Sequence, residues 1–488
     1  MKVSGAVLSF PKTYNKMSKP VKASVWFMVG SFLQKGISFL TIPIFTRLLS
    51  TEEYGIVSVY TAWSSILVIF ATLNLSGGVY NRGLLKYEEN KFTASLQGLS
   101  TVFAISLLLI YLIFHNSFYE FTKLSHTLML TMLICFIFLP GINFWYVGQR
   151  FKFEYKNVIT VSIFSTILTT VVTIAAVYFS ENRGFMNILA MTIMPALIAV
   201  PFYLKNFLKG KRFFDKEIWK YALVFNLPLV PHYLSNLVLS QSDRIMINNL
   251  AGSSYAAIYS VAYSVAMIMI ILCDSINASL TPWRYQKLEQ KEYKEIGDAS
   301  QKILILIGSI IVLFNIFAPE IIRLFTPPSY HEAIWVIPPI ILSVYFIFLY
   351  SFFSNVEFYF MKTKFMMLAS VAAAALNILL NYIFIPIYGY LAAGYTTLFC
   401  YVIFTIAHFG FMKKVCKENI GDSQIYDMKK ILLITLAICF LTAASTLLYN
   451  LIMVKFILLA IILILIVVMR NKITNVIRKV VGKREKEY

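Results

Sequence analysis

A lysine in the middle of a long apolar stretch is the first feature of this sequence that suggests chemistry. As a helix, residues 24–49 are long enough to cross the roughly 30 Å hydrocarbon core of a bilayer. Lys35 then lies near the midplane, where a charge costs on the order of 2.5–3.5 kcal/mol and needs a partner or a water-filled cavity. Polar residues at helical spacing form one stripe along this helix: Ser24, Ser31, Gln34, Ser38 and Thr41.

Two interpretations of this stripe remain open. It is a polar packing seam whose lysine pairs within the protein, or it lines a solvated central pathway for something negatively charged. We prefer the pathway. Pro43, two turns after Lys35, predicts a kink in the same helix.

The composition places this stripe in a polytopic membrane protein. The chain has 488 residues, of which 59% are hydrophobic and 14% charged, whereas soluble domains have about 25% charged residues. The first apolar stretch is too long for a signal-peptide core and is expected to remain as an anchor. We predict fourteen membrane spans, near residues 24–47, 55–80, 97–115, 127–148, 157–179, 185–204, 219–242, 254–281, 300–322, 333–361, 365–385, 390–411, 431–449 and 451–469.

The positions of the basic residues predict the orientation. The formal net charge is +20, but 36 of the 43 lysines and arginines fall on the side of the two termini and six on the other, with Lys35 between. Such an imbalance predicts that both termini are cytoplasmic. The excess charge therefore indicates topology and attraction to anionic lipid head groups, and no nucleic-acid partner is expected.

The chain is also internally duplicated. Residues 49–55 open the second span, and the similar residues 250–256 open the eighth, 201 positions later. Six spans separate the copies, so the two copies share one orientation and an axis along the membrane normal. We predict an N-terminal lobe (1–210), a C-terminal lobe (211–417) and a terminal helix pair with a basic tail (418–488).

The seventh span, the counterpart of the first, has a polar face of its own. Pro228 and Pro231 are expected to break or bend this helix. Both lobes therefore begin with a polar-faced helix, as a pathway between the lobes requires. The polar residues recur at a spacing of about 3.5: Asn226, Tyr233, Asn236, Ser240 and Asp243.

Several charged residues have two possible roles each. Arg82 and Arg284, at the cytoplasmic ends of equivalent helices, either anchor the interface or capture an anionic group. Asp274 either pairs with a nearby base or binds a proton or sodium ion that couples transport. Asp243 and Arg244, near the outer face, form a gate or an interfacial ion pair.

Enzymatic motifs are absent. The chain has no GxSxG, GxGxxG, GxxxxGK[ST] or HExxH pattern and no metal-ligand spacing. We therefore expect neither catalysis nor a cofactor, and an ion gradient or the downhill flux of the cargo would drive transport. Glu357 is expected at the membrane interface beside Lys362 and Lys364.

Three segments resemble one family. They are residues 46–55 (TRLLSTEEYG), residues 242–247 (SDRIMI) and residues 381–389 (NYIFIPIYG). In this order they resemble Wzx-type polysaccharide flippases, the polysaccharide transport branch of the multidrug/oligosaccharidyl-lipid/polysaccharide (MOP) exporter superfamily. The third segment is usually followed by Gly-Ala, and Ala392-Ala393-Gly394 departs from that pattern.

The resemblance implies an all-α fold of about fourteen helices, with two pseudo-symmetric six-helix lobes, a terminal pair and a central cavity. It implies a bacterial cytoplasmic-membrane protein that moves undecaprenyl-pyrophosphate-linked oligosaccharides for O-antigen, capsule or a related polymer, possible partners being the polymerase and chain-length machinery. The expected substrate-binding residues are Lys35, Ser31, Gln34, Ser38, Asn226, Asn236, Arg82 and Arg284. Gating or ion coupling is expected at Asp243, Arg244 and Asp274.

Two other functions remain as alternatives. A multidrug or cation antiporter of the same superfamily would favour acidic residues in the N-terminal spans, but Lys35 is basic. A membrane-embedded glycosyltransferase or polysaccharide polymerase would need a substantial outer loop. The predicted outer loops are short and poor in charge.

Overall fold

The computed structural model describes residues 19–362, 364–421 and 424–457. All regular structure in these residues is helical. The helices are α2 (Lys19–Leu40), α3 (Ile42–Leu48), α4 (Thr51–Thr72), α5 (Gly78–Gly83), α6 (Glu89–Ile113), α7 (His115–Thr122), α8 (His126–Phe151), α9 (Tyr155–Tyr178), α10 (Arg183–Gly210), α11 (Lys216–Asn226), α12 (Val230–Leu250), α13 (Ser253–Glu289), α14 (Tyr293–Ile316), α15 (Ala318–Phe325), α16 (Ile337–Tyr359), α17 (Lys364–Tyr388), α18 (Leu391–Ile420) and α19 (Met428–Ser445), with 3₁₀ turns η1 (Leu227–Leu229), η2 (Pro328–Trp335) and η3 (Thr446–Leu448).

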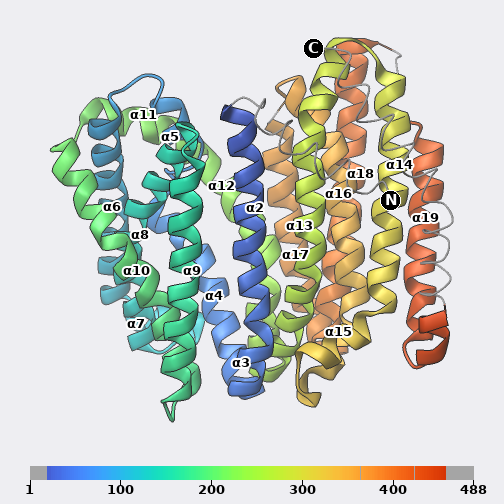
Figure 1. The fold of residues 1–488 in the computed structure, drawn as a ribbon, viewed down its shortest axis with the longest axis horizontal. Coiled ribbons are helices and arrows are strands. Elements are labelled where there is room, and N and C mark those ends of the chain that lie inside the picture. Colours follow the sequence, from blue (N-terminus) through green and yellow to red (C-terminus); the bar gives the residue numbers. More distant parts are fainter. Residues whose placement is uncertain (1–18, 363, 422–423, 458–488) are drawn as a thin grey trace, which may run out of the picture.

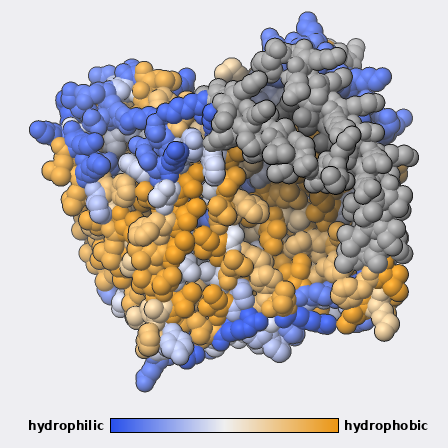
Figure 2. Space-filling view, viewed as in Figure 1, coloured by the Kyte–Doolittle hydropathy of each residue, from blue (hydrophilic) through white to orange (hydrophobic). Residues whose placement is uncertain are grey.

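The chain crosses the membrane many times. Within the described residues, 13 helices are long and apolar enough to span a bilayer, and they coincide in order with the first thirteen predicted spans. The predicted fourteenth span, 451–469, lies mostly outside the described residues. Figure 2 shows an apolar band between hydrophilic surfaces at the two ends of the molecule. The all-α fold class predicted from the sequence is confirmed.

The helices pack in two groups, as Figure 1 shows. The first comprises α2–α10, in which α10 packs against α8, α9 and α6; the second comprises α12–α19, in which α16 and α17 pack against α18. We call the end of the bundle with α3 and α15 the α3 end, and the end with α5 and α11 the α11 end (Figure 1). The predicted lobe boundaries remain a prediction.

Proline and left-handed residues interrupt three spans. The first span breaks between α2 and α3 at Thr41, two residues before Pro43, and the seventh breaks at η1, which contains Pro228. Both breaks confirm the prediction from proline. The second span was predicted to reach residue 80, but α4 ends at Thr72 because Leu73 and Asn74 both have positive φ (48° and 51°).

The two groups contact each other closely at the start of α4 and α13, where the two similar sequence segments lie. At the α3 end, Thr51 Oγ1 of α4 lies 3.3 Å from Ser254 Oγ of α13. A Cβ atom on Gly55 would lie 1.9 Å from the carbonyl oxygen of Ser253, so only glycine permits this approach. Buried small residues continue the contact along both helices, among them Val59 and Ala62 of α4 and Ala257 and Val261 of α13.

Adding one methyl group at this contact should separate the helices. In Gly55→Ala the new Cβ meets a backbone atom that has no rotamer to move, so we expect the free energy of unfolding to fall by about 1–3 kcal/mol or more. Gly410→Ala is the control, because nothing lies within 4 Å of its added Cβ. Its helix should be unchanged or slightly more stable. Equal thermal-unfolding midpoints for the two purified variants would contradict this account.

Candidate functional site

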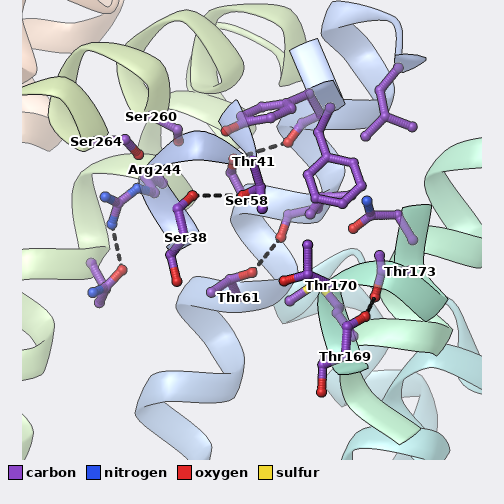
Figure 3. Close-up of a pocket in the computed structure, with 17 residues that line it drawn as sticks. Ser38, Thr41, Ser58, Thr61, Thr169, Thr170, Thr173, Arg244, Ser260 and Ser264 are labelled. Carbon is purple, nitrogen blue, oxygen red and sulfur yellow. Dashed lines mark hydrogen bonds between the residues drawn. The ribbon is translucent and has the colours of Figure 1, made fainter. Parts of the chain in front are cut away.

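A polar cavity of about 430 Å³ lies between the two groups of helices, next to the α4–α13 contact. Residues from α2, α4, α9 and α10 line one side, and residues from α12 and α13 line the other (Figure 3). We call it the central pocket. Its polar lining residues are Ser38, Thr41, Ser58, Thr61, Thr169, Thr170, Thr173, Asn187, Gln241, Arg244, Ser260 and Ser264.

Hydroxyl groups make up most of the polar surface of this pocket. Several donate to the carbonyl one turn earlier in their own helix, as Ser58 does to Tyr54 (2.9 Å) and Thr61 to Val57 (2.8 Å). A hydroxyl that donates in this way keeps its oxygen lone pairs for another group. The pocket therefore suits a ligand that has many hydrogen-bond donors.

Arg244 is the one charged residue in the lining of the central pocket. Its guanidinium lies 4.5 Å from the centre of the Tyr263 ring, and Nη1 donates to the Ser240 carbonyl (3.2 Å) and to the side chain of Gln241. No carboxylate in the described part of the chain forms an ion pair with it. Its positive charge is therefore available to an anionic ligand.

Asp243 points away from Arg244, into the second group of helices. It is 1% exposed and accepts hydrogen bonds from Asn381 Nδ2 (2.7 Å), Thr397 Oγ1 (2.9 Å) and the Tyr259 hydroxyl. Asp243 and Arg244 form no ion pair with each other in the described structure, because consecutive residues of one helix face different directions; of the two roles that the sequence left open, the gate remains a prediction. Within the described residues no group of three acidic, histidine or cysteine side chains has a metal-site arrangement.

The polar stripe of α2 reaches the pocket only at its later residues. Ser38 lines the pocket, whereas Lys35, Gln34 and Ser31 are exposed and lie outside its lining. Lys35 is within electrostatic range of Asp274 on α13, which is also exposed. This placement favours the pairing of Asp274 with a base, one of the two roles that the sequence left open.

Two residues predicted to bind substrate are buried in packed interior instead. Asn226 is 0% exposed and donates to the Leu73 carbonyl, which joins the break in the seventh span to the end of α4. Arg284 is 1% exposed; its guanidinium lies over Phe352 (3.9 Å) and donates to Asn277 (3.1 Å). The helix α13 continues past the predicted end of the eighth span at residue 281, to Glu289. Asn236 is exposed but outside the pocket lining.

Arg82 lies at the α11 end beside a second cavity. The cavity, of about 530 Å³, is lined by Lys86, Tyr87, Glu217, Lys220, Tyr221, Val224 and Phe225; we call it the α11 pocket. Arg82 is exposed and lies over Phe225 (5.7 Å), and Lys86 lies over Tyr87 (5.0 Å) and Tyr221 (5.2 Å). Interaction with the Tyr87 side chain raises the pKa of Lys86, so Lys86 stays charged.

Four residues that line the central pocket were not predicted from the sequence, although their spacing gives a weak signal. Thr169 and Thr173 of α9 recur four positions apart, as do Ser260 and Ser264 of α13. Each pair places two hydroxyls on one helix face. Weak polar pairs of this kind are common in apolar helices, and only the fold brings these four to one cavity.

Solved structures of similar fold are membrane transporters. The chain matches a lipid II flippase MurJ in an inward closed conformation with a TM-score of 0.68, at 16% identity, over 92% of this chain and 100% of that one. It matches a multidrug resistance MATE family transporter of the MOP superfamily, in an inward-facing conformation, with a TM-score of 0.64 at 14% identity, over 80% and 96%. The fold is that of the MOP superfamily.

Sequence comparisons identify the family within this fold. A family model described as polysaccharide biosynthesis protein matches residues 21–288, and one described as MatE matches residues 228–383. Since the first covers more than half of the chain, the chain belongs to the polysaccharide biosynthesis protein family. A membrane protein of Methanocaldococcus jannaschii is 23% identical over 86% of this chain and 88% of its own, and Lsg locus putative protein 1 of Haemophilus influenzae is 23% identical over 56% and 68%.

The Asp243 cluster should contribute strongly to stability. Asp243→Ala leaves the donors of Tyr259, Asn381 and Thr397 without this acceptor, and each stranded buried group costs about 1–3 kcal/mol. We expect a lower thermal-unfolding midpoint than in the control Asp298→Ala, which removes an exposed carboxylate from α14. Equal midpoints would show that the cluster is not an energetic unit.

Proposed function

We propose that this protein is a flippase that moves undecaprenyl-pyrophosphate-linked oligosaccharide units across the bacterial cytoplasmic membrane. The observation that supports this most directly is the central pocket, where many hydroxyls surround one arginine without a partner carboxylate. An oligosaccharide presents hydroxyl donors and acceptors, and its diphosphate needs a positive charge at the same depth. Family membership supports the polysaccharide pathway as the source of this cargo.

The proposed orientation places the α11 end in the cytoplasm, together with both termini. The basic residues that the sequence assigns to the opposite side include Arg47, Arg183 and Arg323, which belong to the α3 end of the fold. The two lobes, residues 1–210 and 211–417, would alternate around the central pocket, with residues 418–488 as an appended helix pair. The polymer, whether O-antigen, capsule or another, is set by the cargo's sugars, and the polymerase and chain-length machinery are the proposed partners.

Lys35 and Arg244 are the proposed counter-charges along the pathway. Lys35 lies on α2 one turn before Ser38, which lines the central pocket, so the diphosphate would meet Lys35 before Arg244. Asp274 acts electrostatically on Lys35 from the other group of helices. We propose that the diphosphate replaces Asp274 as the partner of Lys35, while Ser31, Gln34 and Asn236 offer hydrogen bonds to the sugars.

The α11 pocket is the proposed first contact of the cargo with the protein. Arg82, Lys86 and Lys220 surround three aromatic rings there, an arrangement that combines charge for a phosphate with ring faces for a sugar. Glu217 opposes an anion in this pocket, and it accepts a hydrogen bond from the Tyr87 hydroxyl (3.4 Å). Asp243 and Asp274 remain the candidates for gating or ion coupling.

The multidrug or cation antiporter remains the second candidate because the MatE model matches residues 228–383. The positive charge in the central pocket argues against an antiporter of cationic drugs. A cationic drug would be repelled by Arg244, and the described lining contains no carboxylate to attract it. The matched solved proteins are transporters and a flippase, which gives the polymerase alternative no support.

Loss of the Arg244 charge should abolish export without loss of the protein. In Arg244→Gln we expect polymer display to fall roughly tenfold or more, because a charge-assisted hydrogen bond is worth about 1.5–3 kcal/mol. Arg244→Lys should retain part of the activity. The measurement is surface polymer in a strain that lacks the native protein, normalised to the amount of the variant in the membrane.

Two further variants make this test specific. Arg323→Gln removes an exposed arginine at the same α3 end and should export normally. Lys35→Ala should lose export at normal abundance, and Lys35→Glu should be worse because it repels the diphosphate. Normal export by both Arg244→Gln and Lys35→Ala would refute a cationic pathway.

The α11 pocket should govern cargo capture. The double variant Arg82→Gln/Lys86→Gln should bind the lipid-linked oligosaccharide more weakly, and the difference should be largest at low salt, where charges are least screened. Lys205→Gln/Lys209→Gln, two exposed lysines of α10 at the same end, controls for net charge. Equal binding by both double variants at every salt concentration would return Arg82 to an anchoring role.

A further inference from the structure

An isolated ionisable pair lies inside the second group of helices. Glu357 of α16 and His408 of α18 are both 0% exposed, and His408 Nδ1 lies 3.0 Å from each carboxylate oxygen. Glu357 was predicted at the interface beside Lys362 and Lys364; its backbone carbonyl does accept from the Lys362 amide (2.9 Å), but its side chain is packed inside the bundle. The residue faces a neighbouring helix, away from the surface where Lys362 pairs with Glu418 (3.3 Å).

The surroundings of this pair are largely aromatic. The Tyr350 ring stacks on the His408 ring, with 5.5 Å between ring centres. The Phe404 and Phe365 rings lie roughly perpendicular to it, with ring centres at 4.5 and 5.7 Å. His408 Nε2 has no hydrogen-bond partner among the described residues. In that part of the chain, Glu357 takes part in one ion pair only, with His408.

Other charged or titratable groups on the packing helices are engaged elsewhere. On α13, Arg284 donates to Asn277 and lies over Phe352, and Asp274 acts electrostatically on Tyr350 and Lys35. Before α19, the Tyr426 hydroxyl donates to the Phe352 carbonyl (3.0 Å). On α12, which also packs against α17, His232 is bonded to Ser370 (3.0 Å).

Counting charges gives the number of protons that the buried pair holds. With one proton the pair is neutral overall, whether the proton is on the imidazole or on the carboxyl. Without that proton, a carboxylate would be buried with no positive partner, which costs several kcal/mol. A second proton would leave a buried positive imidazolium beside a neutral carboxyl group, and this charge would also have no partner of opposite sign. The closed pair therefore holds one proton.

The open pair behaves differently. In water, glutamate and histidine titrate near pH 4.3 and pH 6.5 respectively, so above about pH 6.5 a hydrated pair keeps no proton between them. We propose that Glu357 and His408 form a proton-binding site that releases one proton to the water that enters when α16 and α18 part. Glu357 lies two residues before the end of α16 at Tyr359, so this water enters from the α11 end.

The sign of the pH dependence follows from linkage. The open state binds fewer protons than the closed state, so raising the pH favours opening. For one proton, the equilibrium between closed and open changes about tenfold per pH unit above roughly pH 6.5. Through this site the proton concentration at the α11 end would control how readily the second group of helices opens.

Hydrogen–deuterium exchange of the full-length protein in lipid nanodiscs tests this without any cargo. After correction for the intrinsic rate, protection of the α16 amides near Glu357 should fall about tenfold per pH unit above roughly pH 6.5. In Glu357→Gln this slope should disappear, because the amide neither binds nor releases a proton. Glu418→Gln, which removes an exposed carboxylate of α18, should keep the slope of the native protein.

His408→Gln provides a second variant in case Glu357→Gln does not fold. It keeps a donor for Glu357 but removes the base of the pair, so the buried carboxyl group would hold the proton itself. The slope should then begin near the pH at which a hydrated carboxyl group titrates, about 4.3, instead of near 6.5. A native slope of zero, a native-like slope in Glu357→Gln, or an onset in His408→Gln that stays near pH 6.5 would overturn the proposal. Any of these results would make the pair a purely structural contact.

A transport measurement connects this site to the proposed function. Only this experiment rests on the proposed flippase activity. In proteoliposomes, flipping of a fluorescent undecaprenyl-pyrophosphate-linked oligosaccharide should depend on the pH at the α11 end in the native protein and in Glu418→Gln, but not in Glu357→Gln. If the native protein flips none of this lipid, the proposed function fails while the exchange result stands. If it flips the lipid equally at every pH, the proton site fails while the flippase stands.

Discussion

The close approach of α4 and α13 at Gly55 is the contact on which the site depends. The backbone of Ser253 packs directly against Gly55, which has no side chain. Beyond this point the two helices remain in contact through their small buried residues. These helices begin with the two similar sequence segments, residues 49–55 and 250–256, so the contact joins corresponding positions of the predicted repeat. The central pocket forms beside it, with one wall from each group.

The fold and the broad class were predictable from the sequence because hydrocarbon imposes strong rules. Apolar length predicts the spans, and proline predicts the breaks at Thr41 and η1. The positions of α4's last residues were not predictable, since Leu73 and Asn74 adopt a left-handed conformation without a glycine or proline at either position. The predicted span therefore continued past the observed end of the helix.

Side-chain direction was the part that the sequence left undetermined. Asn226 and Arg284 both belong to polar or basic patterns that suggested the cavity, yet both are buried among other residues. Asp243 and Arg244 were predicted to form a gate or an interfacial ion pair, and a sequence pattern cannot show that the two side chains contact different neighbours. The pocket itself required helices from both repeats, which are far apart in the sequence, to meet.

Acidic and basic side chains of the second group differ in where they find partners. Its buried acidic side chains are satisfied internally: Asp243 accepts three hydrogen bonds, and Glu357 contacts His408. The charge that faces the central pocket is the guanidinium of Arg244. An anion that enters therefore meets an unpaired positive charge, whereas a cation meets no free carboxylate. The second group thus buries its acidic side chains against partners of their own and presents the half-buried guanidinium of Arg244 to the central pocket.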